Sequence, residues 1–277
     1  MKMLFLGDVV GRSGRDAVVE RMPGLRKELD LDFVVVNAEN AAAGFGMTPK
    51  ICDAMFAAGV DVITGGNHSW DQREIIPYIS EQKRLQRPAN FPQGTPGTGA
   101  GLYPARGGKK VAVISVMCRL FMDPLDCPFA AVDRLAPKEN PRSAGADAVL
   151  VDVHGEASSE KMALGHYLDG RASLVVGSHT HTPTADAQIL TAGTAYQTDA
   201  GMCGDYDSVI GMKKEGSVDR FVRKMRGERL SPADGEATVC GVFVETDDAT
   251  GLAVHVAPLR QGGRLRPEWP VYPPPSA

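Results

Sequence analysis

The sequence has few cysteines, and their spacing is not that of a structural or redox site. The five cysteines are odd in number, scattered along 277 residues and never spaced C-x-x-C. This pattern argues against a disulfide framework and a thiolate zinc site, and it predicts a reducing, cytoplasmic location. The cysteines are Cys52, Cys118, Cys127, Cys203 and Cys240.

The sequence also lacks long apolar runs and an excess of positive charge. No apolar run approaches the ~20 residues that a membrane span needs, and the apolar start is interrupted at Asp8, unlike a secretory signal. Thirty Lys and Arg against 34 Asp and Glu give a net charge of -4. We therefore expect no duplex-DNA partner and no membrane partner, and any anionic substrate must be bound by local groups.

The chain does contain a regular alternation of apolar runs and amphipathic segments. The apolar runs lie at 3–6, 33–36, 60–63, 111–116, 148–153 and 174–176. This is the pattern of buried parallel strands covered by helices, and it predicts an α/β fold. Thr48 as N-cap, Pro49 in the first turn and Gly59 as a stop predict a helix at 51–58.

The C-terminal third has a different character. Segments 188–198, 238–245 and 252–256 are β-like, with one helix expected near 218–225, and they predict a second sheet. Two packed mixed sheets flanked by helices form a four-layer α/β sandwich. No linker or repeat divides the chain, so we expect one domain over 1–277. Stretches 93–108 and 261–277 are predicted to be coil.

Polar side chains of ligand type follow the expected strands. Taken singly, each has a structural interpretation as an Asx-turn, a solvated turn, a helix cap or a histidine with satisfied hydrogen bonds. Ligands in open α/β sheets collect outside the carboxyl ends of the strands, however, and these residues all stand there. We expect His166 and His255, which lie elsewhere, to have surface or packing roles. The candidate residues are Asp8, Glu39, Asn40, Asn67, His68, His154, His179 and His181.

The chemistry of these residues predicts a metal centre. His179 and His181 are alternate residues, which in an extended segment point to the same side and share a site. Oxygen and imidazole ligands without thiolates suit Fe or Mn, with Zn, Co and Ni as alternatives, and a carboxylate can bridge two ions. Two ions about 3.5 to 4 Å apart would hold a hydroxide and clamp phosphoryl oxygens.

The same residues form motifs that resemble the calcineurin-like metallophosphoesterases, in order and over about two thirds of the chain. The G-N-H at 66–68 and the G-x-H-x-H at 177–181 are the most specific. Two departures, Val10 in place of a histidine after Asp8 and Glu39 in place of an aspartate, are similar to the YmdB-like bacterial branch. So are D-V-V-G-R-x-G at 8–14, N-A-E-N-A-A-x-G at 37–44 and G-x-N-H-x-W-D at 65–71.

The resemblance implies roles for these positions. One metal would be held by Asp8, Glu39, Asn40 and His181, and the other by Glu39, Asn67, His154 and His179, so that Glu39 bridges. His68 would protonate the leaving alkoxide as general acid, a role that suits an imidazole. The resemblance also implies phosphodiesterase activity, including activity on 2',3'-cyclic nucleotides.

Two further stretches have a structural and a functional interpretation. The glycine-rich turn at 7–14 matches neither the dinucleotide-binding fingerprint nor the P-loop fingerprint. Arg12 or Arg15 either contacts a substrate phosphate or lies at the solvent-exposed start of a helix. The basic run is either a solvated helix face or a rim that attracts RNA ends or nucleotides. It comprises Lys213, Lys214, Arg220, Arg223, Lys224, Arg226 and Arg229.

The sequence therefore predicts a cytoplasmic, dinuclear metal-dependent phosphodiesterase that acts on a small nucleotide through attack of a metal-bound hydroxide. The resemblance implies that this substrate is a 2',3'-cyclic nucleotide. One alternative is a phosphomonoesterase or phosphoprotein phosphatase with the same metals. Another is a metal-binding regulatory protein that acts through partners. A homo-oligomer and binding of RNA ends stay open.

Overall fold

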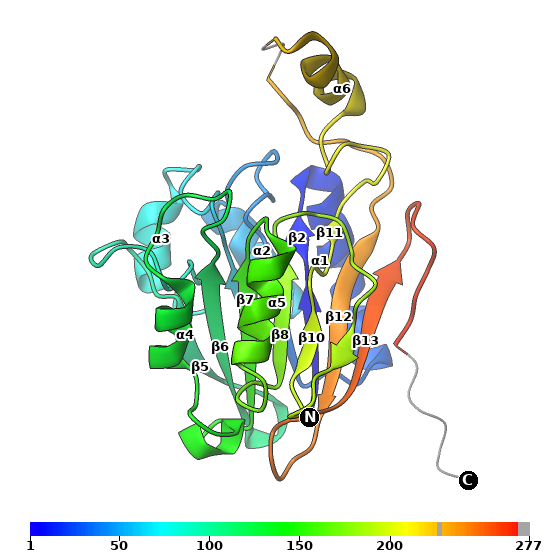
Figure 1. Cartoon of the computed structure of the whole chain (residues 1–277). Helices are drawn as coiled ribbons and strands as arrows, with labels where there is room; N and C mark the ends of the chain where they lie inside the picture. The colour runs from blue at the N-terminus through cyan, green and yellow to red at the C-terminus, as the bar shows by residue number, and fades with distance from the viewer. Residues whose placement is uncertain (226–228, 271–277) are drawn as a thin grey trace.

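The computed structural model describes residues 1–225 and 229–270, and two β-sheets packed face to face form its centre (Figure 1). The five-stranded sheet has the order β13-β12-β1-β3-β4, and the six-stranded sheet has the order β5-β6-β7-β8-β10-β9. The bounds in the first are β1 Lys2–Leu6, β3 Phe33–Asn37, β4 Val62–Thr64, β12 Val239–Thr246 and β13 Ala253–Gln261. In the second they are β5 Ala100–Pro104, β6 Lys110–Met117, β7 Ala148–His154, β8 Leu174–Ser178, β9 Gln188–Ile189 and β10 Ala195–Gln197.

Six α-helices are found in the described part of the chain. They are α1 Gly11–Glu28, α2 Pro49–Ala58, α3 Ile75–Glu81, α4 Pro128–Leu135, α5 Ser158–Tyr167 and α6 Lys214–Arg223. Short 3₁₀ helices at Arg106–Gly108 and Pro141–Ala144 and a two-stranded pair, β2 Asp8–Val9 with β11 Met202–Cys203, complete the elements. No helix within 1–225 or 229–270 is long and apolar enough to cross a membrane.

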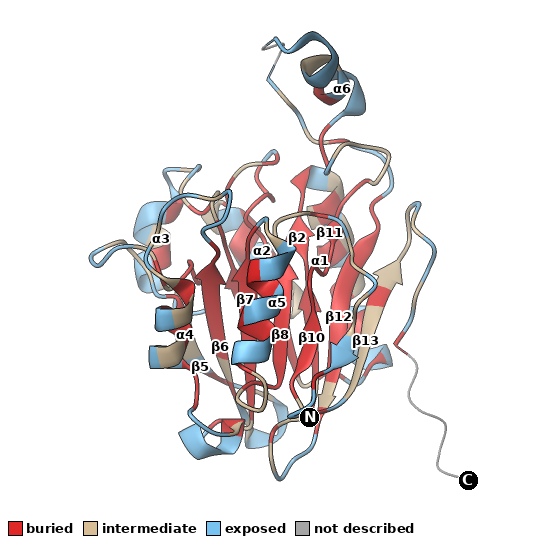
Figure 2. Cartoon of the chain, viewed as in Figure 1, coloured by how far each residue is buried: buried red, intermediate tan, exposed pale blue. Residues whose placement is uncertain are grey.

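Period-two alternation along the strands builds the layers. In β1, Leu4 and Leu6 pack with α1 and α2, whereas Met3 and Phe5 point into the core between the two sheets. In β6, Val113 faces that same inter-sheet core, and the next strands of this sheet pack their other face on α4 and α5. The strands at the centre of both sheets are buried (Figure 2). The predicted four-layer α/β sandwich is confirmed.

The C-terminal strands correct one part of the prediction, because they do not form a second sheet of their own. β12 pairs antiparallel with β1 and carries β13 at its edge, while β10 pairs parallel with β8. The prediction failed because strand partners are set by long-range packing, which local periodicity does not contain. Each sheet is mixed. The six-stranded sheet has a parallel centre with an antiparallel strand at each edge. In the five-stranded sheet β1, β3 and β4 are parallel, and β12 and β13 are added antiparallel on one side.

Predictions that depend on neighbouring residues agree with the structure more closely than the prediction of strand pairing does. Thr48 Oγ1 accepts a hydrogen bond from the N–H of Ile51, and Gly59 ends α2 with φ of 110°, as the predicted N-cap and stop residues require. The stretch 93–108 is not all coil, because it contains β5, which pairs with β6. The helix expected near 218–225 is α6, which begins four residues earlier and stands away from the body as an arm (Figure 1). Arg226 of the basic run and 271–277 of the predicted coil tail lie outside the described residues.

Candidate metal centre

The candidate residues lie where the ends of strands from both sheets meet. Asp8, Glu39 and Asn67 follow β1, β3 and β4 of one sheet, while His154 and His179 come from β7 and the end of β8 in the other. A buried carboxylate joins the two sheets here. Asp152 in β7 accepts hydrogen bonds from Thr64 Oγ1 (2.5 Å) and Asn37 Nδ2 (3.3 Å) across the inter-sheet space. The expected convergence is therefore made by two facing sheets rather than by one sheet edge.

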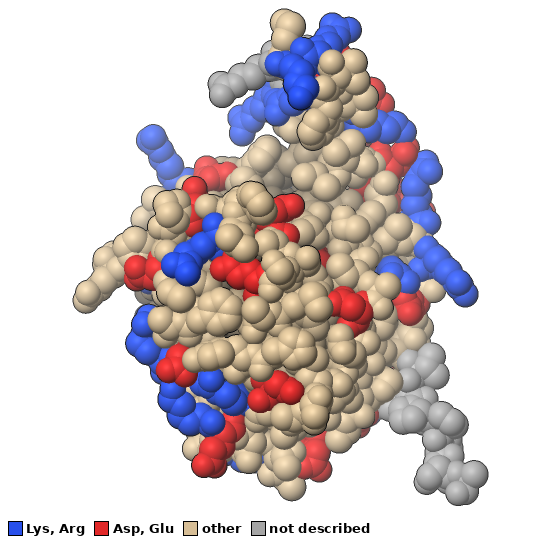
Figure 3. Space-filling model, in the orientation of Figure 1, with Lys and Arg blue, Asp and Glu red and all other residues tan. Residues whose placement is uncertain are grey.

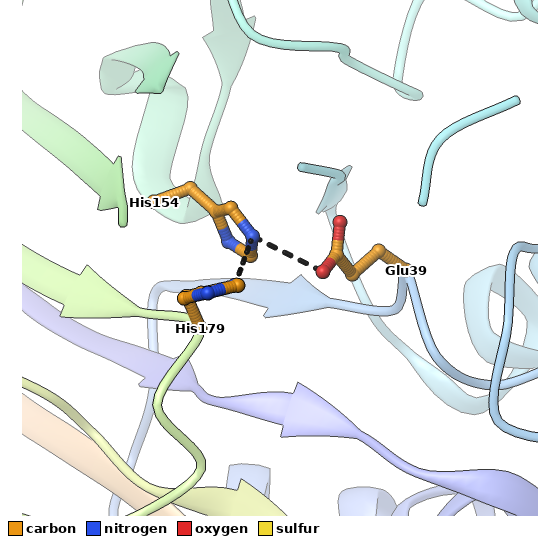
Figure 4. Close-up of side chains that lie close together, drawn as sticks. All are labelled: Glu39, His154 and His179. Carbon is orange, nitrogen blue, oxygen red and sulfur yellow. Dashed lines mark hydrogen bonds and ion pairs between the residues drawn. The ribbon is translucent and has the colours of Figure 1, made fainter. Parts of the chain in front are cut away.

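Glu39, His154 and His179 form the centre of the site (Figure 4). One ligand atom from each lies within 4.8 Å of the others. His154 Nε2 lies 3.1 Å from Glu39 Oε1, 3.1 Å from His179 Nδ1 and 2.9 Å from Asn67 Oδ1. A ring nitrogen carries at most one proton, so it can donate to only one of these three atoms. At least two of these three atoms therefore face His154 Nε2 without a shared proton, and their lone pairs point toward the same place.

Hydrogen bonds on the far side of the His154 ring orient it toward this cluster. The Ser178 hydroxyl donates to Asp152 Oδ1 (2.7 Å), so its oxygen is the acceptor for His154 Nδ1 at 3.0 Å. This relay directs Nε2 at the other ligand atoms, which is the usual support of a metal-binding histidine.

Asp8 and His181 present a second pair of facing lone pairs. His181 Nδ1 lies 2.8 Å from the carbonyl of Ile210, which can only accept, so Nδ1 carries the proton. Nε2, the ring nitrogen that this hydrogen bond leaves available to a metal ion, lies 3.9 Å from Asp8 Oδ1. The same Asp8 oxygen lies 3.9 Å from His154 Nδ1, so Asp8 stands between the two histidines.

Unsatisfied buried oxygens show that this donor set fits a cation. Among the described residues of the site, Asn40 Oδ1 is buried without a hydrogen-bond partner, and Glu39 Oε1 makes no hydrogen bond but has an ion-pair contact with His154 Nε2 at 3.1 Å. Leaving such oxygens unpaired is costly, and a metal ion removes that cost. Gly66 adds a steric requirement, because a Cβ there would overlap His154 Nε2 and Glu39 Oε2. The oxygen and imidazole cluster can hold a divalent metal ion.

The backbone of the histidine turn corrects the reasoning behind the His-x-His prediction. His179 has φ of 98° and His181 has φ of 64°, so this segment is not extended. Left-handed backbone is strained for residues other than glycine and concentrates at functional sites. The N–H of His179 donates to both oxygens of Asp8, at 3.2 and 3.0 Å. Both histidines reach the site through a strained turn rather than through strand alternation.

His68 lies beside the cluster without joining it. Its N–H donates to Glu39 Oε2 (3.0 Å), and its ring Nδ1 lies 2.7 Å from Asp71 Oδ2. The ring packs edge-on against Phe45, with 5.2 Å between the centroids. Because Asp71 holds Nδ1, the atom of His68 that is left for a substrate is Nε2.

The charged groups of the cluster shift one another's pKa values. Burial acts to raise the pKa of Glu39, but the neighbouring His154 imidazole outweighs it and lowers that pKa to about 2. Burial acts to lower the pKa of His154, but Glu39 and Asp8 raise it to about 9. Burial and the nearby His154 charge lower the pKa of His179 to about 3. In the metal-free protein, the His154 imidazolium therefore supplies positive charge that a metal would otherwise supply.

The site opens into a cavity of about 410 Å³. Two glutamates line it, and none of its described lining residues is Lys or Arg. Arg12 and Arg15 are absent from that lining, which favours the solvated-helix interpretation for them. His166 is exposed, and His255 packs 6.0 Å from Phe243, as expected. The cavity is lined by Glu39, Asn40, Phe45, His68, Glu156, His179, Thr180, His181, Thr182, Ile210, Met212 and Leu230.

Sequence reasoning missed the residues that support the histidine turn. Lys161 Nζ donates to Ser178 O (2.7 Å) and to Asp199 Oδ2 (2.8 Å), and all of these groups are buried. Asp199 also accepts from the N–H of Thr180 at 3.0 Å. Asp199, two residues after β10, was a usable signal because it is a carboxylate near a strand end. Lys161 gave no such signal, because a lysine inside a helix is usually exposed and only the structure shows that this one is buried.

Comparisons with known proteins place the chain in a family. The model of the YmdB-like protein family matches residues 4–259. A 2',3'-cyclic-nucleotide 2'-phosphodiesterase of Bacillus subtilis (strain 168) is 47% identical over 256 residues, which cover 92% of this chain and 95% of the relative.

Solved structures give the same result. A hypothetical protein from Thermus thermophilus superposes with a TM-score of 0.87 at 43% identity, covering 95% of this chain and 100% of the other. A phosphatase from Mycoplasma pneumoniae superposes with a TM-score of 0.86 at 32% identity, covering 95% and 93%. The chain therefore belongs to the YmdB-like protein family, as its motifs indicate.

Proposed function

We propose that this chain is a metal-dependent phosphodiesterase that hydrolyses 2',3'-cyclic nucleotides. The observation that carries the proposal is the convergence of Glu39, Asn67 and His179 on His154 Nε2. Two of these ligands, Glu39 and His179, line the same cavity as His68. The activity named for the Bacillus subtilis relative, which is nearly half identical over almost the whole chain, supports the choice of substrate.

The residues of the site would hold two ions. Asp8, Asn40 and His181 would complete one coordination sphere, and Asn67, His154 and His179 the other, with the Glu39 carboxylate shared between them. This oxygen-rich and imidazole-rich set suits Fe or Mn, with Zn, Co and Ni as alternatives. When bound, such a pair lowers the pKa of water and neutralises charge on the phosphoryl oxygens.

The chain itself supplies the proton that hydrolysis requires. A water oxygen gives up a proton to solvent as it forms a new bond to phosphorus, one P–O bond of the cyclic ester breaks, and the ribose oxygen leaves as an alkoxide. His68 Nε2 is the atom that gives the alkoxide its proton, because Asp71 accepts the hydrogen on Nδ1 and stabilises the imidazolium. His68 regains from solvent the proton that it donates to the alkoxide. Phe45 limits the ring's freedom to turn.

The charge of the cavity favours diesters over monoesters. A dianionic monoester needs more positive charge than a monoanionic diester, and the lining offers Glu39 and Glu156 without a described Lys or Arg. The second candidate function is a phosphomonoesterase, which the phosphatase from Mycoplasma pneumoniae favours.

The decisive experiment measures kcat/KM for 2',3'-cyclic AMP, 3'-AMP and a phosphoserine peptide at one metal loading. The proposal requires the highest value for the cyclic diester. Faster hydrolysis of either monoester supports the phosphatase, and no hydrolysis by metal-replete protein supports the regulatory alternative.

A further inference from the structure

A second cavity, of about 330 Å³, lies beside the metal centre. It shares Phe45 and Leu230 with the metal-site cavity, so these two side chains form a common wall. The carboxylate of Asp71, which holds the His68 ring, also lines it. The second cavity therefore begins next to the group assigned to protonate the leaving oxygen.

This cavity carries the positive charge that the metal-site cavity lacks. Its lining includes Arg220, in α6, and Arg229, in the segment that returns from the arm. A phosphate at the metal ions lies in the other cavity, so these arginines are not placed for the scissile group. Arginine binds phosphate oxygens through two parallel N–H groups, and a second phosphate is the natural ligand of this surface.

The rest of the arm has the same electrostatic character. Although the whole chain has a net charge of -4, Lys and Arg gather on the α6 arm (Figure 3). Part of this charge is paired with carboxylates, since Lys213, Lys214 and Arg223 form ion pairs with Asp234, Asp207 and Asp219, respectively. Phe221 is 75% exposed on the same helix and offers an aromatic face on which a base can stack.

We propose that the substrate of this site is the 3' end of single-stranded RNA that carries a 2',3'-cyclic phosphate, and that Arg220 and Arg229 bind an upstream phosphate. The inference rests on the proposed function and extends it from mononucleotides to polynucleotide ends. A cyclic mononucleotide has one phosphorus atom, which the metal centre occupies, and it leaves the arginine-lined cavity unused. An oligonucleotide adds one phosphate, and so one negative charge, with each further nucleotide, and it can occupy both the metal-site cavity and the arginine-lined cavity.

The first test needs no substitution. It compares kcat/KM for 2',3'-cyclic AMP with that for an RNA oligomer of about eight nucleotides ending in the same cyclic phosphate, across a range of salt concentrations. We expect the oligomer to be favoured about tenfold or more at low salt, since each charge-assisted phosphate contact contributes about that factor. The preference should fall with log salt with a slope of about -0.7 per phosphate contact.

The second test uses Arg220→Ala and Arg229→Ala, with Arg134→Ala as the matched control. Arg134 is exposed on α4 and lines neither cavity. Each arm variant should lower kcat/KM for the oligomer about tenfold more than for the mononucleotide and make the salt slope shallower, whereas the control should change neither. Arg229 lies outside α6, so its variant tests the idea without a risk to the helix.

The outcomes separate this inference from the function on which it rests. If neither substrate is hydrolysed by metal-replete protein, the proposed function and the inference both fail. If the mononucleotide is hydrolysed but the oligomer is not favoured, or if all three variants behave alike, the inference alone fails. If the arm variants change the sedimentation of the protein but not the substrate ratio, the arm binds another protein surface, and the RNA assignment is overturned.

Discussion

Lys161 and Asp199 form a buried ion pair, 2.8 Å between Nζ and Oδ2, that holds both sides of the histidine turn. The lysine donates to the carbonyl of Ser178, before His179, and the aspartate accepts from the N–H of Thr180, after it. Two charged side chains therefore hold the backbone on either side of His179, whose φ of 98° is strained.

Removing the lysine should destabilise the protein strongly. Lys161→Met leaves the Asp199 carboxylate buried and unpaired, and such a loss costs about 3 to 5 kcal/mol of unfolding free energy. Lys138→Ala is the control, because Lys138 pairs with Asp133 at the surface, with side chains 68% and 44% exposed, and should cost less than about 1 kcal/mol. Urea unfolding of both variants checks this, and similar losses would show that the buried pair has no special role.

Gly66 should be required for metal binding rather than for folding. In Gly66→Ala the added Cβ would overlap His154 Nε2 and Glu39 Oε2, and it would displace both ligand groups. We expect a folded protein with little bound metal by elemental analysis. Gly24→Ala is the matched control, since a Cβ there meets only Glu28 Oε1, at 3.6 Å. Full metal retention by Gly66→Ala would contradict the assignment of these two groups as ligands.

The metal-free protein should lose stability as pH rises above neutrality. Folding raises the pKa of His154 from 6.5 to about 9, so the folded state binds this proton more tightly than the unfolded state. The contribution is full below the unfolded value and disappears as pH rises through the folded value, a loss of roughly 2 to 4 kcal/mol. Unfolding the chelated protein between pH 6.5 and 9.5 measures it.

The same measurement on a variant and on the metal-bound protein provides the controls. His154→Gln should be less sensitive over this range, because it has no imidazole to titrate. Metal requires a neutral imidazole, so the metal-bound protein should not lose stability in the same way. A chelated wild-type protein whose stability is flat between these pH values would contradict the charge pairing of His154 with Glu39.

His68→Ala should keep its metal and lose most of its turnover, since general acid catalysis contributes about 10² to 10⁴ in rate. The loss should shrink for a nitrophenyl diester, because that leaving group needs no proton. Asp71→Asn, which changes the partner of His68 Nδ1, should show a weaker form of the same leaving-group dependence. If His68→Ala loses metal instead, His68 is a ligand.

The sequence was informative where a residue's role depends on its near neighbours. The apolar runs at 3–6 and 33–36 predict buried strands, and the structure forms β1 and β3 there, with buried side chains on both faces. The candidate ligands follow strand ends, so the general rule for α/β sheets brings together those of one sheet, such as Asp8 and Glu39. The meeting of Glu39 with His154 also needs the packing of the two sheets.

The sequence was uninformative where the role depends on distant partners or on backbone strain. The positive φ of His181 has no local signature, because its sequence neighbours are also compatible with a strand. Lys161 and Asp199 are 38 positions apart and meet only in the folded chain. The pairing of β12 with β1 joins the two ends of the sequence, for which periodicity holds no information.

A metal titration tests the central claim most directly. Protein freed of metal by chelation is titrated with Mn²⁺ or Fe²⁺ while hydrolysis of 2',3'-cyclic AMP is followed. The account predicts no turnover without metal and a rise to a plateau at two equivalents per chain. Turnover by the metal-free protein, or a plateau at one equivalent, would contradict the paired-metal centre shared through Glu39.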